Sequence, residues 1–173
     1  TLATLRALIA ADPARAQQML DHMIAYLRAT LDASRATTHP LRTEFHRLRD
    51  YLELMAIRMG PRLPYTLDLP PELADVPVPT LLLQPVVENS IQHGLEPKVQ
   101  GGRIAVRAAR EHGRLVLEVT DSGLGDAAGA GDGKGFGLVQ IRERLASLHG
   151  EHAQVAFGTD AQGARTRIVL PIA

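Results

Sequence analysis

The sequence contains no cysteine and no tryptophan, and aromatic residues make up only 3% of its 173 residues. Without cysteine the chain forms neither disulfides nor thiolate metal sites, and the few aromatic rings argue against a base-stacking surface for nucleic acid. Lys and Arg together number 19, as do Asp and Glu, so no basic surplus favours nucleic acid as a partner. The chain also has no long apolar run and no signal peptide.

The first sixty residues have the apolar spacing of helices. Asp12 and Pro13 predict a helix start, with the aspartate as cap and the proline at the first helical position. Gly60 and Pro61 end a later helix. The first two helices predict a hairpin whose apolar stripes need a partner, and we expect a second copy of the chain to supply it. The stripe of the second helix comprises Ala16, Met19, Leu20, Met23, Ile24, Leu27 and Leu31.

The remainder of the chain mixes strands and helices without strict alternation, which favours an α+β fold over a doubly wound parallel sheet. Two pairs of strands are expected, the first joined by a turn at His112-Gly113 and the second ending at Pro171. Residues 80–94 predict one apolar helix kinked at Pro85, and residues 138–149 predict another helix.

Three polar or glycine-rich motifs carry the candidate chemistry. The first is the run from Glu88 to Gly94. On a helix, Asn89 and His93 share a face one turn apart, while Val87 and Ile91 point toward a core. An asparagine beside a glutamate suits an oxygen-rich Mg²⁺ site. Taken alone, however, the run also fits an ordinary helix end with a polar edge.

The second motif begins at Asp121, at the end of a predicted strand. Asp121 has the same parity as the apolar residues of the strand 115–119, so its carboxylate is expected to point inward and to need a partner. The exocyclic amine of adenine would supply donors, and Gly123 and Gly125 would let the backbone pass close to the base. A plain turn after a strand is the competing interpretation.

The third motif lies at the start of the helix 138–149. Its glycines expose backbone N–H groups beside a helix N-terminus, where a polyphosphate could bind, and its lysine adds positive charge. A flexible linker is the alternative. The motif comprises Gly133, Lys134, Gly135, Phe136, Gly137 and Leu138.

Other glycine-loop motifs do not fit. A P-loop requires glycine where this chain has Ala128, and serine or threonine where it has Gly135. Gly123 and Gly125 resemble part of a dinucleotide fingerprint, but loop-like glycine sequence follows where a helix should begin. The catalytic-loop and metal-binding signatures of protein kinases are absent.

In this order the three motifs resemble the asparagine box and the two glycine boxes of the Bergerat-fold ATPases, the group that includes histidine kinases, MutL and type II topoisomerases. The finer resemblance is to the LytS-like branch of sensor histidine kinases. The segment 81–94 is similar to that branch's asparagine box almost residue for residue, and the resemblance covers essentially the whole chain. Tyr51-Leu52-Glu53 with Arg58, and Gly137-Leu138 followed by Ile141-Arg142-Glu143-Arg144-Leu145, also resemble its pattern.

The resemblance implies a two-layer sandwich, a mixed sheet packed on helices, preceded by a helical hairpin. Residues 1–40 would be the remainder of a dimerisation and phosphotransfer region, and residues 41–173 the ATP-binding catalytic domain. The protein would be a histidine kinase that uses ATP and Mg²⁺, forms a homodimer through its N-terminal helices and passes the phosphoryl group to a response regulator. It would be the cytoplasmic region of a sensor whose membrane anchor lies upstream.

Site roles are implied by the same resemblance. Asn89 would coordinate Mg²⁺, Asp121 would bind the adenine amine, and Glu88 would polarise or position the attacking group. The nucleotide-binding residues would be Asn89, Gln92, His93, Asp121, Gly123, Gly125, Gly133, Lys134, Gly135, Gly137 and Leu138.

The sequence departs from the family pattern in three places. Gln92 replaces the usual lysine, and Gly163-Ala164 replaces the usual Gly-Thr, which removes a hydroxyl near the nucleotide. None of the seven histidines lies in the family's His-Phe-Leu-Phe-Asn acceptor segment, so we expect the acceptor upstream of Thr1. Two alternatives remain open: an ATPase or serine kinase in which Glu88 activates water or a hydroxyl, and a degenerate nucleotide-binding and dimerisation module.

Overall fold

The structure is a computed structural model of the chain and describes residues 2–33, 37–125 and 136–172. The helices are α1 (Leu2–Ala11), α2 (Pro13–Ala33), α3 (Leu41–Met59), α4 (Gln84–Asn89) and α5 (Phe136–His149), and a π-helix follows α4 at Ser90–Leu95. The strands are β1 (Thr38–Pro40), β2 (Tyr65–Asp68), β3 (Pro77–Pro79), β4 (Ile104–Glu111), β5 (Arg114–Asp121), β6 (Gln154–Asp160) and β7 (Gly163–Pro171).

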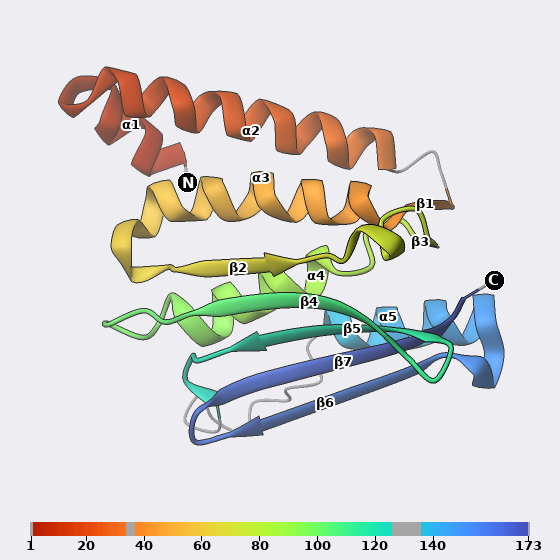
Figure 1. Cartoon of the computed structure of the whole chain (residues 1–173). Coiled ribbons are helices and arrows are strands. Elements are labelled where there is room, and N and C mark those ends of the chain that lie inside the picture. The colour runs from red at the N-terminus through yellow and green to blue at the C-terminus, as the bar shows by residue number, and fades with distance from the viewer. Residues whose placement is uncertain (1, 34–36, 126–135, 173) are drawn as a thin grey trace.

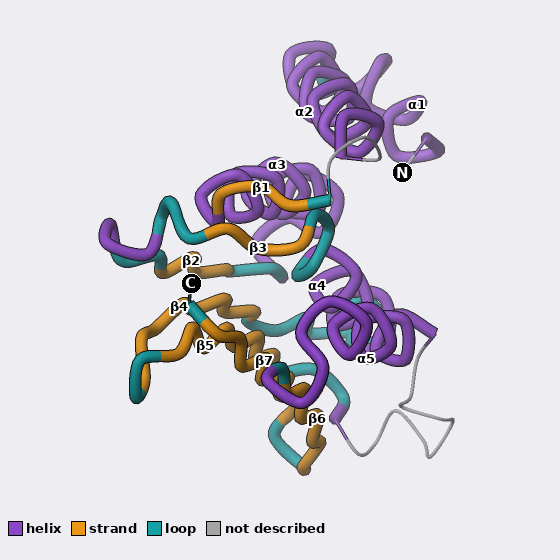
Figure 2. Tube along the Cα trace, turned by 90° about the vertical axis from the view of Figure 1, so that its right-hand side faces the viewer, coloured by secondary structure: helices purple, strands orange, loops and turns teal. Residues whose placement is uncertain are grey.

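Five strands form one mixed sheet in the order β2-β4-β5-β7-β6. β2 runs parallel to β4, and the other neighbours are antiparallel. β4 and β5 are joined by His112 and Gly113, which both have the positive φ that a tight hairpin turn requires. Figure 2 shows α4 and α5 together on one side of this sheet, so the predicted α+β sandwich of a mixed sheet and helices is confirmed.

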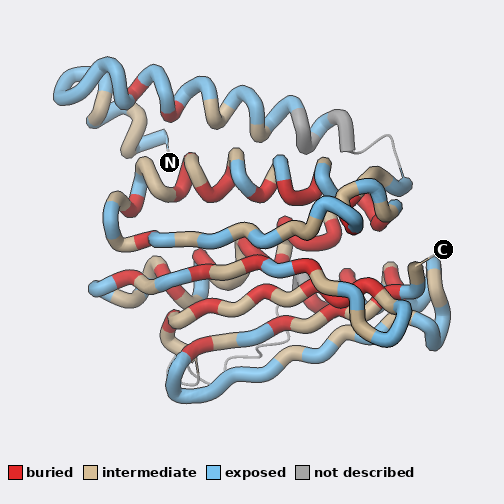
Figure 3. The backbone as a smooth tube through the Cα atoms, viewed as in Figure 1, coloured by how far each residue is buried: buried red, intermediate tan, exposed pale blue. Residues whose placement is uncertain are grey.

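The core lies between the sheet and the helices, where the buried residues gather in Figure 3. Alternate residues of β4 and β5 point into it, because successive side chains of a strand face opposite sides of the sheet. The predicted inward positions are all fully buried: Ile104, Val106, Ala108, Leu115, Leu117 and Val119.

The start of α3 is fastened to the segment that leads into α4. Pro40 precedes α3 without providing a side-chain cap, and the N–H groups of Leu41 and Arg42 donate instead to carbonyls of residues 76 and 74, at 2.9 and 2.8 Å. One oxygen of the Glu44 carboxylate, which is only 1% exposed, accepts the N–H of Leu83 at 2.7 Å. These bonds satisfy two of the four free donors at the start of α3 and fix the position from which α4 begins.

The predicted helix over residues 80–94 is wrong in its start and in its kink. Leu81 has φ 56°, a left-handed conformation that a helix interior does not accept, and α4 begins only at Gln84. Pro85 therefore lies in the first turn, where its missing N–H costs no helical bond and causes no kink. From Ser90 the chain continues as a π-helix, in which Glu96 donates to Ile91, five residues earlier.

The N-terminal hairpin is present, and Asp12 caps α2 as predicted by accepting the N–H of Arg15 at 3.1 Å. The single apolar stripe predicted for α2 is divided, however. Ala16 and Met19 are buried on the side that faces α3, which lies directly beneath α2 in Figure 1. A second stripe remains exposed by 40–69%: Leu20, Ile24, Leu27 and Leu31. The chain itself thus covers part of the apolar surface that we assigned to a second copy.

Candidate functional site

Asp121, the last residue of β5, is the centre of the candidate site. Its side chain is 8% exposed and points to the same side as the apolar residues of β5, as its parity predicts. Its neighbours across the sheet are Ile104 of β4 and Ala164 of β7. Its Oδ1 atom accepts the N–H of Gly123 at 2.9 Å, which closes the turn that follows the strand.

Burial and polar contacts act in opposite directions on the Asp121 carboxyl. Burial raises the pKa of this carboxyl, because charge in a low-dielectric environment is penalised. Hydrogen bonds from the Ser90 side chain and the Gly123 and Ala164 backbone, together with the charge of Lys98, lower the pKa without cancelling the effect of burial. A ligand that brings hydrogen-bond donors to Asp121 would therefore be favoured.

The first two motifs meet at two glycines. A β-carbon on Gly94 would stand 3.0 Å from Asp121 Oδ1, and one on Gly123 would stand 2.5 Å from the Gly94 carbonyl. The Gly94 carbonyl accepts the N–H of Leu124 at 2.9 Å. Gly125 has φ 52°, and a β-carbon there would lie 2.0 Å from the Asp160 carbonyl. Only glycine permits this close passage of two backbones beside the carboxylate.

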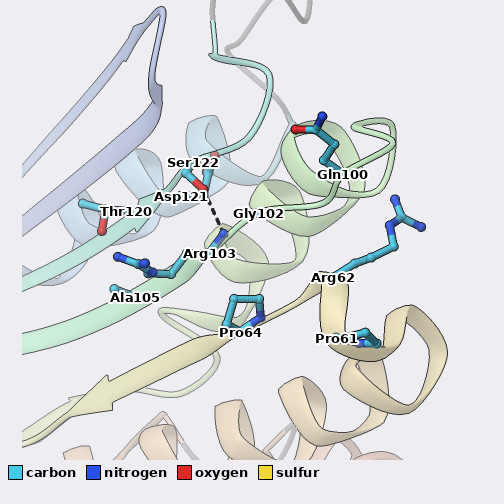
Figure 4. Close-up of a pocket in the computed structure, with 10 residues that line it drawn as sticks. All are labelled: Pro61, Arg62, Pro64, Gln100, Gly102, Arg103, Ala105, Thr120, Asp121 and Ser122. Atoms are coloured by element: carbon cyan, nitrogen blue, oxygen red, sulfur yellow. Dashed lines mark hydrogen bonds between the residues drawn. The ribbon is translucent and has the colours of Figure 1, made fainter.

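Lys98, which the sequence argument did not select, secures the same turn. Its Nζ atom donates to the Ser122 carbonyl at 2.7 Å and lies 3.5 Å from that of Gly123. Ser122 is further held by Arg103, whose N–H donates to the serine Oγ at 2.8 Å, the dashed line in Figure 4. A cavity of about 560 Å³ borders this turn. The sequence signal that could have indicated Lys98 is its position in the loop directly after the first motif.

Glu88, the predicted catalytic residue, faces the helical region. Its Oε1 atom accepts the hydroxyl of Tyr26 from α2 and, at 3.0 Å, the side-chain amide of Gln84. Glu88 and Gln92 both line a cavity of about 380 Å³ between α2, α3 and the α4 region, and Asp121 is not among its lining residues. The structure therefore brings these two predicted site residues together with Tyr26 rather than with the carboxylate at the end of β5.

The other predicted residues are distributed as follows. Asn89 ends α4, half-buried and directly before Ser90, whose side chain reaches Asp121. His93 is exposed. Leu138, 5% exposed, packs in the core near the start of α5, which also contains Gly137. Gly133, Lys134 and Gly135 lie outside the described residues.

A metal would not be held here by a cage of protein ligands. Over residues 2–33, 37–125 and 136–172, no group of three histidine, cysteine, aspartate or glutamate side chains is placed to bind a metal ion. Mg²⁺ commonly binds through one or two protein oxygens together with substrate phosphates and water. The side-chain amide oxygen of Asn89 fits that mode. Asn89 directly precedes Ser90, whose side chain bonds to Asp121.

The comparisons with known proteins identify the family of the chain. Residues 75–173 match the family described as histidine kinase-, DNA gyrase B-, and HSP90-like ATPase, and residues 1–63 match the histidine kinase family. The chain belongs to this ATPase family. Within it, the chain contains the ATP-binding catalytic region of a two-component histidine kinase, which confirms the resemblance drawn from the sequence.

Individual relatives cover nearly the whole chain. The sensor histidine kinase BtsS of Escherichia coli is 34% identical over 98% of this chain and 30% of its own length. The sensor protein LytS of Oceanobacillus iheyensis is 27% identical over 99% of this chain and 32% of its own length. The chain thus spans about a third of the length of these relatives.

Solved structures share the fold. The histidine kinase domain of the blue-light activated histidine kinase of Erythrobacter litoralis has a TM-score of 0.61 at 18% identity, over 91% of this chain and 75% of that one. The catalytic domain of the histidine kinase ThkA has a TM-score of 0.59 at 16% identity, over 79% and 95% of the two chains.

Proposed function

We propose that this chain binds ATP against Asp121 and promotes transfer of its γ-phosphoryl group to a histidine outside these 173 residues. The observation that carries the proposal is the buried Asp121 carboxylate at the end of β5, beside which Gly94 and Gly123 pack closely against each other. The exocyclic amine of adenine donates hydrogen bonds and would be a further partner for this carboxylate.

Asn89 is the residue that would hold Mg²⁺, and the ion would neutralise charge on the phosphates. Lys98 keeps the turn at Ser122 and Gly123 in place under the base. The glycines at residues 133, 135 and 137, with Lys134, are proposed to surround the phosphates, and Gln92 and His93 to contribute at the edge of the site.

In the transfer itself, the bond between the γ-phosphorus and the oxygen of ADP breaks and a bond from an imidazole nitrogen to phosphorus forms. The attacking nitrogen carries no proton, ADP leaves with the electron pair of the broken bond, and the proton on the other ring nitrogen can then be released from the cationic phosphoimidazole. Glu88 is proposed to orient the imidazole and to stabilise the positive charge that develops on it. None of the chain's own histidines is proposed as acceptor, so the chain is expected to bind ATP without labelling itself.

Calorimetric titration with ATP and ADP, with and without Mg²⁺, tests the nucleotide site. We expect binding that Asp121→Asn abolishes, because the amide presents an NH₂ group or a weaker acceptor to the adenine amine. Asp68→Asn is the matched control, since Asp68 is 63% exposed and pairs with Arg107 on β4. Absence of binding by the folded wild-type chain would refute the proposal and leave a degenerate dimerisation module.

Incubation with γ-labelled ATP tests the acceptor. We expect no acid-labile label on the chain and slow release of inorganic phosphate. Strong labelling of the chain would place the acceptor within it, and rapid hydrolysis would favour an ATPase in which Glu88 activates water.

The exposed stripe of α2 is the proposed dimer surface, and an aspartate of a response regulator is the proposed final acceptor. Four large apolar side chains at helical spacing, exposed by 40–69%, are what an interhelical interface buries. No helix in the described part of the chain is long and apolar enough to cross a membrane. Attachment to a membrane-anchored sensor is therefore proposed from the family alone.

A further inference from the structure

Three side chains from two regions of the chain form a closed hydrogen-bonded triangle. The Tyr26 hydroxyl of α2 donates to Glu88 Oε1. The Gln84 amide nitrogen lies 2.7 Å from the Tyr26 hydroxyl and 3.0 Å from Glu88 Oε1. Tyr26 belongs to the part that matches the histidine kinase family, and Glu88 to the part that matches the ATPase family. The triangle therefore links the helical region to the residue next to the proposed Mg²⁺ ligand.

Tyr26 continues the side of α2 that docks on α3. Ala16, Met19, Met23 and Tyr26 follow one another at spacings of three and four residues, which places them along one stripe of the helix. The Tyr26 ring lies 5.6 Å from that of Tyr51 on α3. Burial, and then the nearby charge of Glu88, raise the pKa of the Tyr51 phenol, so Tyr51 stays neutral.

The docked contact is loosely packed around this triangle. A cavity of about 380 Å³ lies beside it, lined by Met23, Leu54 and Met55 on its apolar side and by Arg58 and Glu96 on its polar side. Arg58 and Glu96 already pair with each other at 2.7 Å. Side chains that line an open cavity have packing partners on fewer sides, so the directional bonds to Glu88 contribute a larger share of the docking than they would in a close-packed core.

We propose that Tyr26 is a latch: it keeps α2 docked on α3 and α4, and it occupies the Oε1 atom of Glu88 and holds that side chain toward α2, so that phosphoryl transfer requires its release. The inference rests on the proposed function, because it assigns regulation to the same Glu88. A carboxylate that accepts two protein donors has less capacity to orient an incoming imidazole. When α2 leaves α3, the Tyr26 hydroxyl leaves with it and Glu88 becomes available.

Amide hydrogen exchange across α2 tests the docking. Most of the stability of a helix in a protein comes from packing of its apolar side, so α2 is expected to exchange its amides faster when it leaves α3. Loss of a hydrogen bond to a charged acceptor is expected to raise the exchange rates of α2 in Tyr26→Phe by about tenfold or more. Tyr65→Phe is the matched control, because Tyr65 donates to the Glu53 carboxylate in another part of the fold. The control is expected to leave α2 unchanged.

Autophosphorylation tests the regulation, in the protein that carries the acceptor histidine and with γ-labelled ATP. We expect the initial rate to rise by about tenfold in Tyr26→Phe, to stay at the wild-type level in Tyr65→Phe and to fall in Glu88→Gln. ADP affinity is expected to be equal in wild type and Tyr26→Phe, since Tyr26 does not touch the Asp121 turn.

The outcomes distinguish a failure of the Tyr26 latch from a failure of the proposed phosphoryl transfer. Unchanged α2 exchange in Tyr26→Phe overturns the latch. Faster α2 exchange in Tyr26→Phe also overturns it if the wild type is labelled normally and the variant is labelled at the same rate. If neither wild type nor any variant is labelled, the proposed phosphoryl transfer is wrong. A rate increase shared equally by Tyr26→Phe and Tyr65→Phe would also overturn the latch, because the effect would then reflect general loosening.

Discussion

Asp121 and Gly94 lie so close together that a β-carbon on residue 94 would stand 3.0 Å from the Asp121 Oδ1 atom. The two residues come from different motifs, one at the end of β5 and one in the π-helix after α4. Their approach brings the two motifs into direct contact. The space beside the Asp121 carboxylate therefore depends on the absence of a side chain at Gly94.

Gly94→Ala is therefore expected to weaken ADP binding by about tenfold while the protein remains folded, because the added methyl group intrudes on the carboxylate. Calorimetric titration measures the affinity. Gly158→Ala is the control: no atom lies within 4 Å of a β-carbon at that position of β6. Unchanged affinity in Gly94→Ala would show that the base does not bind at this wall.

Asp121 is expected to make the stability of the nucleotide-free protein depend on pH. Burial raises its pKa above the usual 3.8, so between the two values the folded state binds more protons than the unfolded state. Stability contributed by this group is thus present below about pH 4 and falls as pH rises through the folded-state pKa.

Asp121→Asn cannot lose a proton and should lack this fall. Relative to wild type, the variant is expected to gain unfolding free energy between about pH 4 and neutral pH, because only the wild-type carboxyl must lose its proton in a buried position. Urea unfolding at several pH values between about 4 and about 8 measures the difference. A difference that shrinks as pH rises would contradict a raised pKa for the Asp121 carboxyl. The same substitution should abolish nucleotide binding.

Lys98→Met is expected to lower ADP affinity by roughly tenfold, because the ammonium group bonds to the Ser122 carbonyl at 2.7 Å and holds the turn beside Asp121. Lys98→Arg should recover part of the loss, since a cationic donor is retained. Titration of both variants beside wild type provides the measurement. Equal ADP affinities for Lys98→Met and wild type would show that Lys98 does not contribute to nucleotide binding.

Ala164→Thr is expected to raise ADP affinity by a few-fold. Ala164 pairs with Asp121 across the sheet and has the same parity as the buried Thr166 and Ile168, so its side chain points to the Asp121 side. A threonine hydroxyl there could donate to the carboxylate or to the base. Arg165→Thr, one position along and on the opposite side of β7, is the control. If both variants bind equally to wild type, position 164 does not border the nucleotide.

Ile24→Glu is expected to reduce dimer formation at least tenfold without unfolding the chain, because a charge in an apolar interhelical interface is costly to bury. Ile24 is 40% exposed in the middle of the exposed stripe of α2. Val99→Glu is the control, since Val99 is an apolar residue 87% exposed and distant in sequence from α2. Sedimentation equilibrium measures the association. A monomeric wild type would place the dimer surface elsewhere.

The sequence was sufficient to predict those structural features that depend on a few neighbouring residues. Alternation along β5 placed Asp121 on the buried side, Asp12 capped α2, and Gly60 ended α3, because each outcome depends on a few neighbouring residues. The order of the three motifs was sufficient to indicate the family, and the mixed sheet packed on helices followed from that. The domain boundary placed at residue 40 stays a prediction.

Tertiary structure decided what depends on contacts between distant residues. Periodicity cannot show which part of the α2 stripe packs on α3, because it identifies the apolar side of a helix and not the partner of that side. Nor can it show that Glu88 contacts Tyr26, 62 residues away. The left-handed Leu81 and the late start of α4 likewise reflect the bonds that hold residues 80–83 from α3 and α5. The sequence by itself therefore indicated Asp121 and the glycines near it as the proposed nucleotide site, and only the fold added Lys98 to it. Only the packing of α2 decided that the proposed catalytic glutamate is held by a tyrosine of the helical region.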